Sequence, residues 1–319
     1  IVLGALLWVG DVLDRFPSWP PSQEGAATLE LASPAFSPPP GVYDRDIRLT
    51  IRPTNPQAQI IFTTDGTTPT LEMGTMYIRP LRFDASMPGV TVIRAMEVLN
   101  GVSGPIANAA YAVGVQSDLP ILSLVVAPAD LWAVEDGLLT NVWGRGSAWE
   151  RAVQVMYFSP DGDSATGDFA VPAGLRVHGT ESPDAAKQSL RLYFRGEYGM
   201  ARLDYSLFAN HPHQPDQGQS YKRLLLQAGD RSGHWTLFRD QLVADIAADL
   251  DLPVVQGHFV RLFINGESWG IYRLAERIDR FFLEDNYGLR DADLVQDGKP
   301  REGSDEDWDA LVDWVDAHD

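Results

Sequence analysis

The sequence contains no cysteine, and its 25 lysines and arginines are outnumbered by 44 aspartates and glutamates. The absence of cysteine excludes disulfide bonds, thiolate zinc sites and a cysteine nucleophile. It does not indicate a compartment, because a domain of ordinary size is stable without disulfides. The formal net charge of −19 opposes binding to nucleic acid, whose phosphate backbone requires clustered basic residues. We therefore expect no nucleic-acid partner.

Metal-binding and phosphate-binding signatures are also scarce. The chain has no H-E-x-x-H motif and no G-x-x-x-x-G-K-[ST] motif, so the zinc-protease and P-loop signatures are missing. The acidic string at 161–168 is similar to a calcium loop, but Ala165 and Pro172 stand where an EF-hand needs oxygen ligands. His211 and His213 lack a third zinc ligand nearby in the sequence. We predict a turn at 161–168 and no metal site from these residues.

The composition is typical of a folded protein with two domains. Hydrophobic residues make up 45% of the 319 residues, which suffices for a sizeable core. The run at 1–9 is continuously apolar but shorter than the ~20 residues that span a bilayer. It is either the remainder of a leader or membrane anchor or the start of an amphipathic helix, and membrane contact is expected only there. This start and the helical pattern at the other end predict a piece cut at both ends.

The first half of the chain has the pattern of a β-protein. Residues 1–33 hold the apolar segment and a proline-rich linker. Between 34 and 113 short apolar runs alternate with polar residues, as at 47–52, and no helical period occurs. Turn pairs such as Asn100-Gly101 separate the runs. We predict a small all-β, immunoglobulin-like sandwich over 34–113.

The second half, from 119 to 319, mixes strands with helices and predicts an α+β domain. The segment 187–195 alternates cleanly, whereas apolar residues recur every four positions in 238–250, which indicates an amphipathic helix. A hairpin is expected around Asn265-Gly266. The predicted core of this domain consists of Leu190, Leu192, Phe194, Phe238, Leu242 and Ile246.

The order of these elements is similar to that of an N-terminal kinase lobe. In kinases a strand lysine contacts the ATP phosphates, and an acidic residue of the following helix holds it. Lys187 opens a strand, the next helix carries Asp240 and Asp245, and the hairpin after it ends near Glu276. The glycine-rich loop that normally precedes the lysine is missing. A solvated lysine at the start of a strand is the alternative interpretation.

The first domain contains a series of characteristic strings: PAFSPPPGVY (34–43), IIFTTDGTTPT (60–70), the element from Tyr77 to Pro80, VTVIRAMEVLNG (90–101) and Tyr111. Through them it resembles the β-sandwich module at the C-terminus of chitobiase and β-hexosaminidase enzymes. The resemblance implies an accessory domain without catalytic residues, acting as a spacer or docking domain or contacting a glycan.

Seven strings follow one another along the second domain: LPILSLVVAPADLW (119–132), RGSAWERAVQVMYFSPDG (145–162), VPAGLRVHGTES (171–182), KQSLRLYFRGEYG (187–199), YKRLLLQAGD (221–230), LFRDQLVADIAADLDLP (237–253) and VRLFINGESWGIYRLAERIDRFFLEDNYG (260–288). Through these strings, in this order, the domain resembles the CotH-type spore-coat kinases, an atypical protein-kinase-like family.

This second resemblance implies a chemistry and a set of nucleotide-binding residues. It implies ATP- and Mg²⁺- or Mn²⁺-dependent phosphorylation of serine in secreted or surface proteins, hence an extracytoplasmic location. By motif, Lys187 corresponds to the phosphate-contacting lysine and Asp240 to the helix that supports it. Asp245 lies on a similar face, so the partner of the lysine stays open. Glu276 stands where a hinge would meet the adenine.

One departure from the family bears on activity. Between Glu276 and Asp319 we recognise neither the family's catalytic aspartate nor its D-x-D metal string, because DADL (291–294) follows a glycine-ended helix too closely to be that loop. We therefore expect no catalytic and no metal-binding residue in this chain, and a kinase-like N-terminal lobe whose C-terminal lobe is incomplete. The alternative is a non-catalytic surface or scaffold protein that binds glycan or protein through the sandwich and a degenerate lobe.

Overall fold

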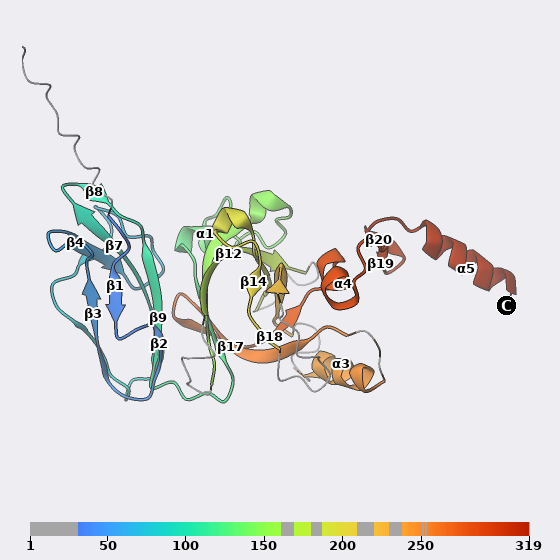
Figure 1. Cartoon of the computed structure of the whole chain (residues 1–319), viewed down its shortest axis with the longest axis horizontal. Helices are drawn as coiled ribbons and strands as arrows, with labels where there is room; N and C mark the ends of the chain where they lie inside the picture. Colours follow the sequence, from blue (N-terminus) through green and yellow to red (C-terminus); the bar gives the residue numbers. More distant parts are fainter. Residues whose placement is uncertain are drawn as a thin grey trace, which may run out of the picture. The chain divides into compact units, whose positions relative to one another are not determined.

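The computed structural model describes residues 31–160, 169–179, 187–208, 220–229, 238–250, 252 and 254–318. These residues form a mostly β structure with few helices (Figure 1). The apolar run at the start of the chain, the acidic string at 161–168, His211 and His213 lie outside the described residues.

The first domain is a β-sandwich, as predicted. One sheet has the strand order β1-β3-β6 and the other β2-β9-β7-β4-β5, with β8 paired to β7. Alternate residues of the strands, such as Ile47, Leu49 and Ile51, point into an apolar core. The strands are β1 (Ala35–Ser37), β2 (Gly41–Tyr43), β3 (Ile47–Arg52), β4 (Gln59–Thr63), β5 (Thr75–Met76), β6 (Leu81–Phe83), β7 (Gly89–Leu99), β8 (Val102–Ser103) and β9 (Ala107–Val113).

The second domain is built around a closed barrel of seven strands in the order β10-β11-β12-β13-β16-β18-β17. Its interior is filled by apolar side chains from every strand. The strands are β10 (Ile121–Val125), β11 (Arg151–Phe158), β12 (Phe169–His178), β13 (Ser189–Tyr193), β16 (Arg223–Gln227), β17 (Gly257–Ile264) and β18 (Glu267–Glu276).

The closed barrel differs from the predicted α+β, kinase-like N-terminal lobe. The sheet closes because β10 pairs with β11 on one side and, in parallel, with β17 on the other. All five residues of β10 are buried. Leu122 and Leu124 point into the barrel core, whereas Ile121 belongs to a separate apolar cluster outside it. Burial on both faces explains why every residue of this strand except Ser123 is apolar.

Short elements connect and follow the barrel strands. The β19–β20 hairpin was not predicted, although its turn, Asp297-Gly298, has the positive φ angles of such turns, 54° and 67°. Among the described residues, no helix is long and apolar enough to cross a membrane. The elements are α1 (Pro128–Trp132), η2 (Ser147–Trp149), η3 (Gly196–Tyr198), β14 (Leu203–Asp204), β15 (Ser220–Tyr221), α3 (Arg239–Asp249), α4 (Arg280–Tyr287), β19 (Leu294–Gln296), β20 (Lys299–Glu302) and α5 (Glu306–His318).

The predicted core of the second domain is half right. Leu190, Leu192 and Phe194 are each 1% exposed and lie in the barrel core. The three residues expected from the helix are wrong, because they are exposed at the N-cap of α3 or within it: Phe238 (56%), Leu242 (47%) and Ile246 (52%).

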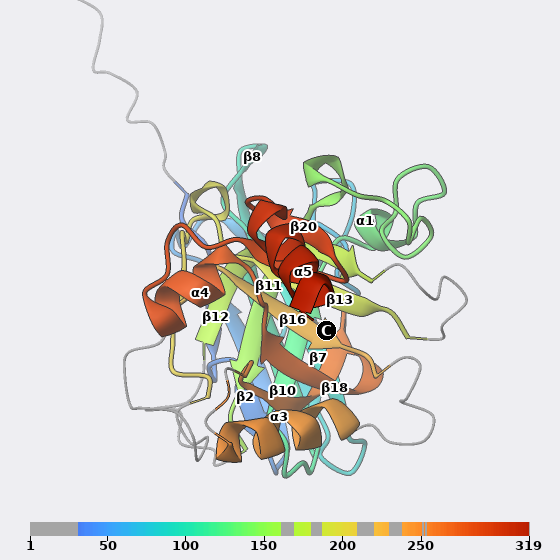
Figure 2. The same ribbon diagram turned by 90° about the vertical axis from the view of Figure 1, so that its right-hand side faces the viewer.

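The orientation of α3 has a polar cause. The helix lies beside β18 and outside the barrel (Figures 1 and 2). Gln241 of α3 accepts a hydrogen bond of 2.7 Å from Nε of Arg273, a buried residue of β18. A buried guanidinium must be hydrogen-bonded, and α3 therefore presents a polar side chain to the barrel instead of its apolar stripe.

Candidate functional site

A group of arginines covers part of the outer surface of the barrel. Since Leu175, Leu190 and Leu224 point into the core, their sequence neighbours face outward. The strand register places these outward-facing residues side by side. Arg176 of β12 is opposite Arg191 of β13, and Tyr193 of β13 is opposite Arg223 of β16. We name this group the arginine cluster, and it consists of Arg176, Arg191, Arg195, Arg223 and Arg277.

Tyr193 lies at the centre of the arginine cluster and is only 3% exposed. The guanidinium carbons lie 4.5 Å (Arg176), 4.9 Å (Arg195), 5.6 Å (Arg223) and 5.8 Å (Arg191) from the centroid of its ring. Cations within about 6 Å of an aromatic face are attracted by its negative quadrupole. The ring therefore offsets part of the repulsion between the arginines.

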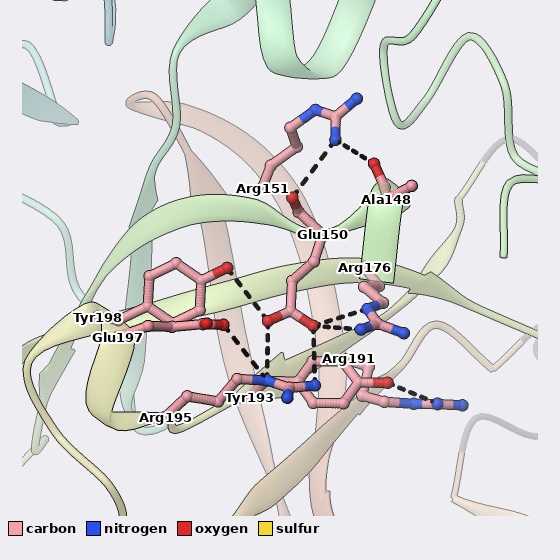
Figure 3. Close-up of polar contacts among 9 residues, drawn as sticks. All are labelled: Ala148, Glu150, Arg151, Arg176, Arg191, Tyr193, Arg195, Glu197 and Tyr198. Carbon is pink, nitrogen blue, oxygen red and sulfur yellow. Dashed lines mark hydrogen bonds and ion pairs between the residues drawn. The ribbon is translucent and has the colours of Figure 1, made fainter. Parts of the chain in front are cut away.

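Glu150 is the first of two buried carboxylates that pair with the cluster (Figure 3). Its side chain is 5% exposed, and its oxygens lie 2.6 Å from Nη2 of Arg176 and 3.0 Å from Nε of Arg195. Tyr198 donates a third interaction, a hydrogen bond of 3.1 Å. Burial, the charge of Glu150 and this hydrogen bond raise the pKa of Tyr198 to about 12.

Asp279 is the second carboxylate. It pairs with Arg223 at 2.8 Å and Arg277 at 3.1 Å. It also begins helix α4, because its side chain accepts hydrogen bonds from the backbone N–H groups of Phe281 and Phe282. The start of α4 is thereby fixed against the arginine cluster.

The arginine cluster keeps an excess of positive charge. In the part of the chain that the structure describes, its five arginines have two buried carboxylate partners, and Glu197, 3.9 Å from Arg195, is 65% exposed. Among the described residues, no carboxylate forms an ion pair with Arg191, which donates to the hydroxyl of Tyr193 and contacts His178. Burial and the nearby charge of Arg191 lower the pKa of Arg277. Such a site can bind an anion with several negative charges.

The structure places Lys187 outside the arginine cluster. Its ammonium donates a hydrogen bond of 2.8 Å to the carbonyl of Ile271 and lies 4.5 Å from the ring centroid of Tyr272. Burial lowers its pKa. Lys187 thus lies at the edge of the barrel, held by β18.

Asp240 and Glu276 occupy two further places. Asp240 is on the exposed side of α3 next to Arg239, whereas Glu276 is buried at the end of β18 and accepts from Gln256 N (2.9 Å) and Asn286 (3.1 Å). Burial raises the pKa of Glu276. In the part of the chain that the structure describes, no hydrogen bond or ion pair joins any two of Lys187, Asp240 and Glu276.

The predicted acidic residues Asp240, Asp245 and Glu276 all interact electrostatically with Arg273. The charges of Asp240, Asp245 and Glu276 all raise its pKa, against a larger lowering by burial. The segment directly after Glu276 nevertheless contributes to the arginine cluster, through Arg277 and Asp279.

The letters G-E-S-W-G at 266–270 fit the G-x-S-x-G motif of hydrolases, but their place in the fold does not. That motif needs its serine on a sharp turn from a strand into a helix. Here Ser268 lies within strand β18, just after the hairpin turn at Asn265-Gly266. The string therefore forms a hairpin and not a nucleophile elbow.

The described residues do not fit a metal ion. They contain no group of three or more histidine, aspartate and glutamate side chains placed to hold one. Within the arginine cluster, both carboxylates are already engaged by guanidinium groups. We therefore derive no step through a metal from these residues.

Sequence patterns revealed only part of the arginine cluster. The alternation of 187–195 predicts that Arg191, Tyr193 and Arg195 share the face opposite the core leucines, so these three residues could be grouped from the sequence. The other members come from strands and connections far along the chain. Glu150, the carboxylate that pairs with two of them, is likewise distant: it is 26 positions from Arg176 and 45 from Arg195.

Comparison with known families supports both resemblances. Residues 175–314 match the model of CotH kinase protein, and residues 38–105 match that of the chitobiase/beta-hexosaminidase C-terminal domain. A search of curated proteins found no match. All five residues of the arginine cluster lie within the first matched segment, and Glu150 precedes it. The chain therefore carries a segment similar to the chitobiase/β-hexosaminidase C-terminal domain, followed by one similar to CotH kinase protein.

Proposed function

We propose that this chain is the nucleotide-binding part of a CotH-like kinase that acts outside the cytoplasm. In this proposal the arginine cluster binds the phosphates of ATP, and the whole protein transfers phosphate to serine residues of secreted or surface proteins. The match at 175–314 supports the kinase class. The observation that carries the proposal is the arginine cluster inside that match, with more positive charge than its buried carboxylates balance.

Arginine suits this role chemically. A planar guanidinium presents paired N–H donors that match the oxygens of a phosphate, and it stays charged at any physiological pH. Stacking on Tyr193 holds the planes of the guanidinium groups in place, which reduces the ordering that a ligand must impose. Both carboxylates of the cluster are held by arginines, so the proposal assigns these residues binding and no transfer step.

The test is calorimetric binding of ATP and inorganic tripolyphosphate to the chain and to Arg191→Gln. We expect the substitution to weaken the binding of both by about 10- to 100-fold, since a charge-assisted hydrogen bond contributes roughly 1.5–3 kcal/mol. Arg290→Gln is the matched control, because Arg290 is exposed and pairs with Glu284, which is not a partner of the arginine cluster. Equal loss in both variants, or no binding by the folded wild type, would contradict the proposal.

A second proposal concerns the β-sandwich. We infer that it contacts a glycan, and the support is its match to a domain that belongs to carbohydrate-active enzymes. This is also the function of the sandwich in the alternative, a non-catalytic surface protein. Binding of the chain to a panel of immobilised oligosaccharides tests it. Glycan binding without any nucleotide binding would favour the surface protein over the kinase.

A further inference from the structure

We propose that Glu150 is a built-in anion that competes with the ligand for Arg176 and Arg195, and so lowers the affinity of the arginine cluster for polyanions. This inference rests on the proposed function, because it concerns the regulation of the same site. It assigns to Glu150 the role of a positioning residue, which acts through the arginines.

The position of Glu150 is that of a bound anion. Its carboxylate accepts hydrogen bonds from Nε of Arg176 (2.7 Å), Nη2 of Arg195 (3.2 Å) and the hydroxyl of Tyr198 (3.1 Å). As ion pairs, Nη2 of Arg176 and Nε of Arg195 also lie 2.6 and 3.0 Å from its oxygens. Figure 3 shows the side chain reaching down between these partners from the start of β11. These donors are of the type that would bind a phosphate group. Glu150 therefore uses donors that a ligand would also use.

The side chain of Glu150 lies against Gly174, where there is space for it because glycine has no Cβ atom. Gly174 of β12 has no side chain, and a Cβ atom at this position would lie 2.5 Å from Oε1 of Glu150. The three atoms nearest to that Cβ all belong to the Glu150 side chain. Since the φ angle of Gly174 is not among the positive ones, alanine is compatible with the strand, and its Cβ would displace the end of the Glu150 side chain.

Charge gives the sign of the effect. Arg176, Arg195 and Arg191 lie around the same ring of Tyr193, so Glu150 is close to any anion that binds there. A negative charge at this distance repels a polyanion in a partly buried site, where screening by water is weak. A residue that only organised the arginines would have the opposite effect, because its removal would weaken binding.

The experiment measures binding of inorganic tripolyphosphate at low salt to the whole chain by calorimetry. Glu150→Gln removes the charge and keeps the shape, whereas Gly174→Ala keeps the carboxylate and displaces it. We expect both variants to bind at least about tenfold more tightly than the wild type. Glu197→Gln and Gly89→Ala are the controls, because Glu197 is exposed near the same arginine and nothing lies near a Cβ at Gly89. Gly89→Ala should leave the affinity unchanged, and Glu197→Gln should change it far less than Glu150→Gln does, because the charge of an exposed carboxylate is screened by water.

The outcomes separate this inference from the proposed function. If the wild type binds and the folded Glu150→Gln and Gly174→Ala variants bind equally or more weakly, the role of Glu150 is overturned and the proposed function stands. No binding by any folded variant overturns the proposed function as well. If Glu150→Gln does not fold, as its buried ion pairs allow, Gly174→Ala decides the question, and thermal unfolding shows which variants are folded.

Discussion

At the scale of single residues, Tyr193 stabilises the close approach of four arginine side chains, whose positive charges repel one another. Four guanidinium groups surround its ring, and its hydroxyl accepts a hydrogen bond of 2.8 Å from Arg191. The ring and the hydroxyl therefore make separable contributions.

Substitution of Tyr193 tests these two contributions. Tyr193→Phe removes only the hydroxyl and is expected to lower the free energy of unfolding by about 1 kcal/mol. Tyr193→Leu also removes the aromatic face and should cost at least about 2 kcal/mol more, because several partly buried cation–π contacts are lost together. Urea unfolding of both variants measures the difference. Equal costs would show that the ring does not offset the arginine repulsion.

A second residue-scale prediction concerns pH. His258 is surrounded by Tyr157 and Phe208, and burial, followed by the charge of Arg273, lowers its pKa to about 4. In the unfolded chain its pKa is about 6.5. The folded state therefore binds fewer protons between these values, so stability is fully present above about pH 6.5 and is lost as the pH falls toward 4.

The loss attributable to His258 should reach about 3 kcal/mol at pH 4, from a shift of roughly 2.5 units at 1.36 kcal/mol each. Unfolding free energies of the wild type and of His258→Phe, measured from pH 7.5 to 4, isolate this contribution from that of the carboxylates. The expected result is a shallower pH dependence in the variant. Parallel curves for the two proteins would contradict it.

At the scale of elements, the strands of the barrel and the helix α3 contribute unequally to the core. Leu192 of β13 is buried and Leu242 of α3 is half exposed. We expect Leu192→Ala to cost about 2–5 kcal/mol, because it leaves a cavity in packed surroundings. The same change at Leu242 should cost no more than about 0.5 kcal/mol. Chemical denaturation of this matched pair checks it, and similar costs would place α3 in the core.

Local patterns predicted most elements but not how they meet. Alternation located the barrel strands, and Asn265-Gly266, with φ angles of 52° and 87°, marked the β17–β18 hairpin. Closure of the barrel was not predictable, because β10 and β17 pair residues about 140 positions apart. The face of α3 that contacts the barrel was also not predicted. It is set by the hydrogen bond between Gln241 and Arg273, which the spacing of apolar residues along the helix does not indicate. The same limit hid the pairing of Glu150 with distant arginines.

At the scale of the whole molecule, one apolar cluster contains residues of both the sandwich and the barrel. Val92 and Ala110 come from the sandwich, and Met156 and Phe263 from the barrel strands. These residues alternate with those that face the separate core of the sandwich, such as Ile93. The two domains therefore share buried apolar surface, although each has a core of its own.

This shared cluster predicts coupled unfolding. Val92→Asp places a charge in the cluster without entering the core of the sandwich, so we expect one thermal transition in the wild type to separate into two in the variant. Ile93→Asp, which enters the core of the sandwich, should instead unfold that domain outright. Calorimetry and near-ultraviolet circular dichroism follow both. A single transition in Val92→Asp would show that the cluster does not couple the domains.

The absence of a side chain at Gly174 also has an evolutionary consequence. Gly174 is needed only while a glutamate lies over it, and Glu150 can lie there only while position 174 carries no side chain. The two positions are therefore expected to change together among related sequences. Where position 150 holds a small or apolar residue, alanine or larger residues should be accepted at 174. An alignment of relatives in which 174 varies freely beneath an unchanged glutamate would contradict this coupling.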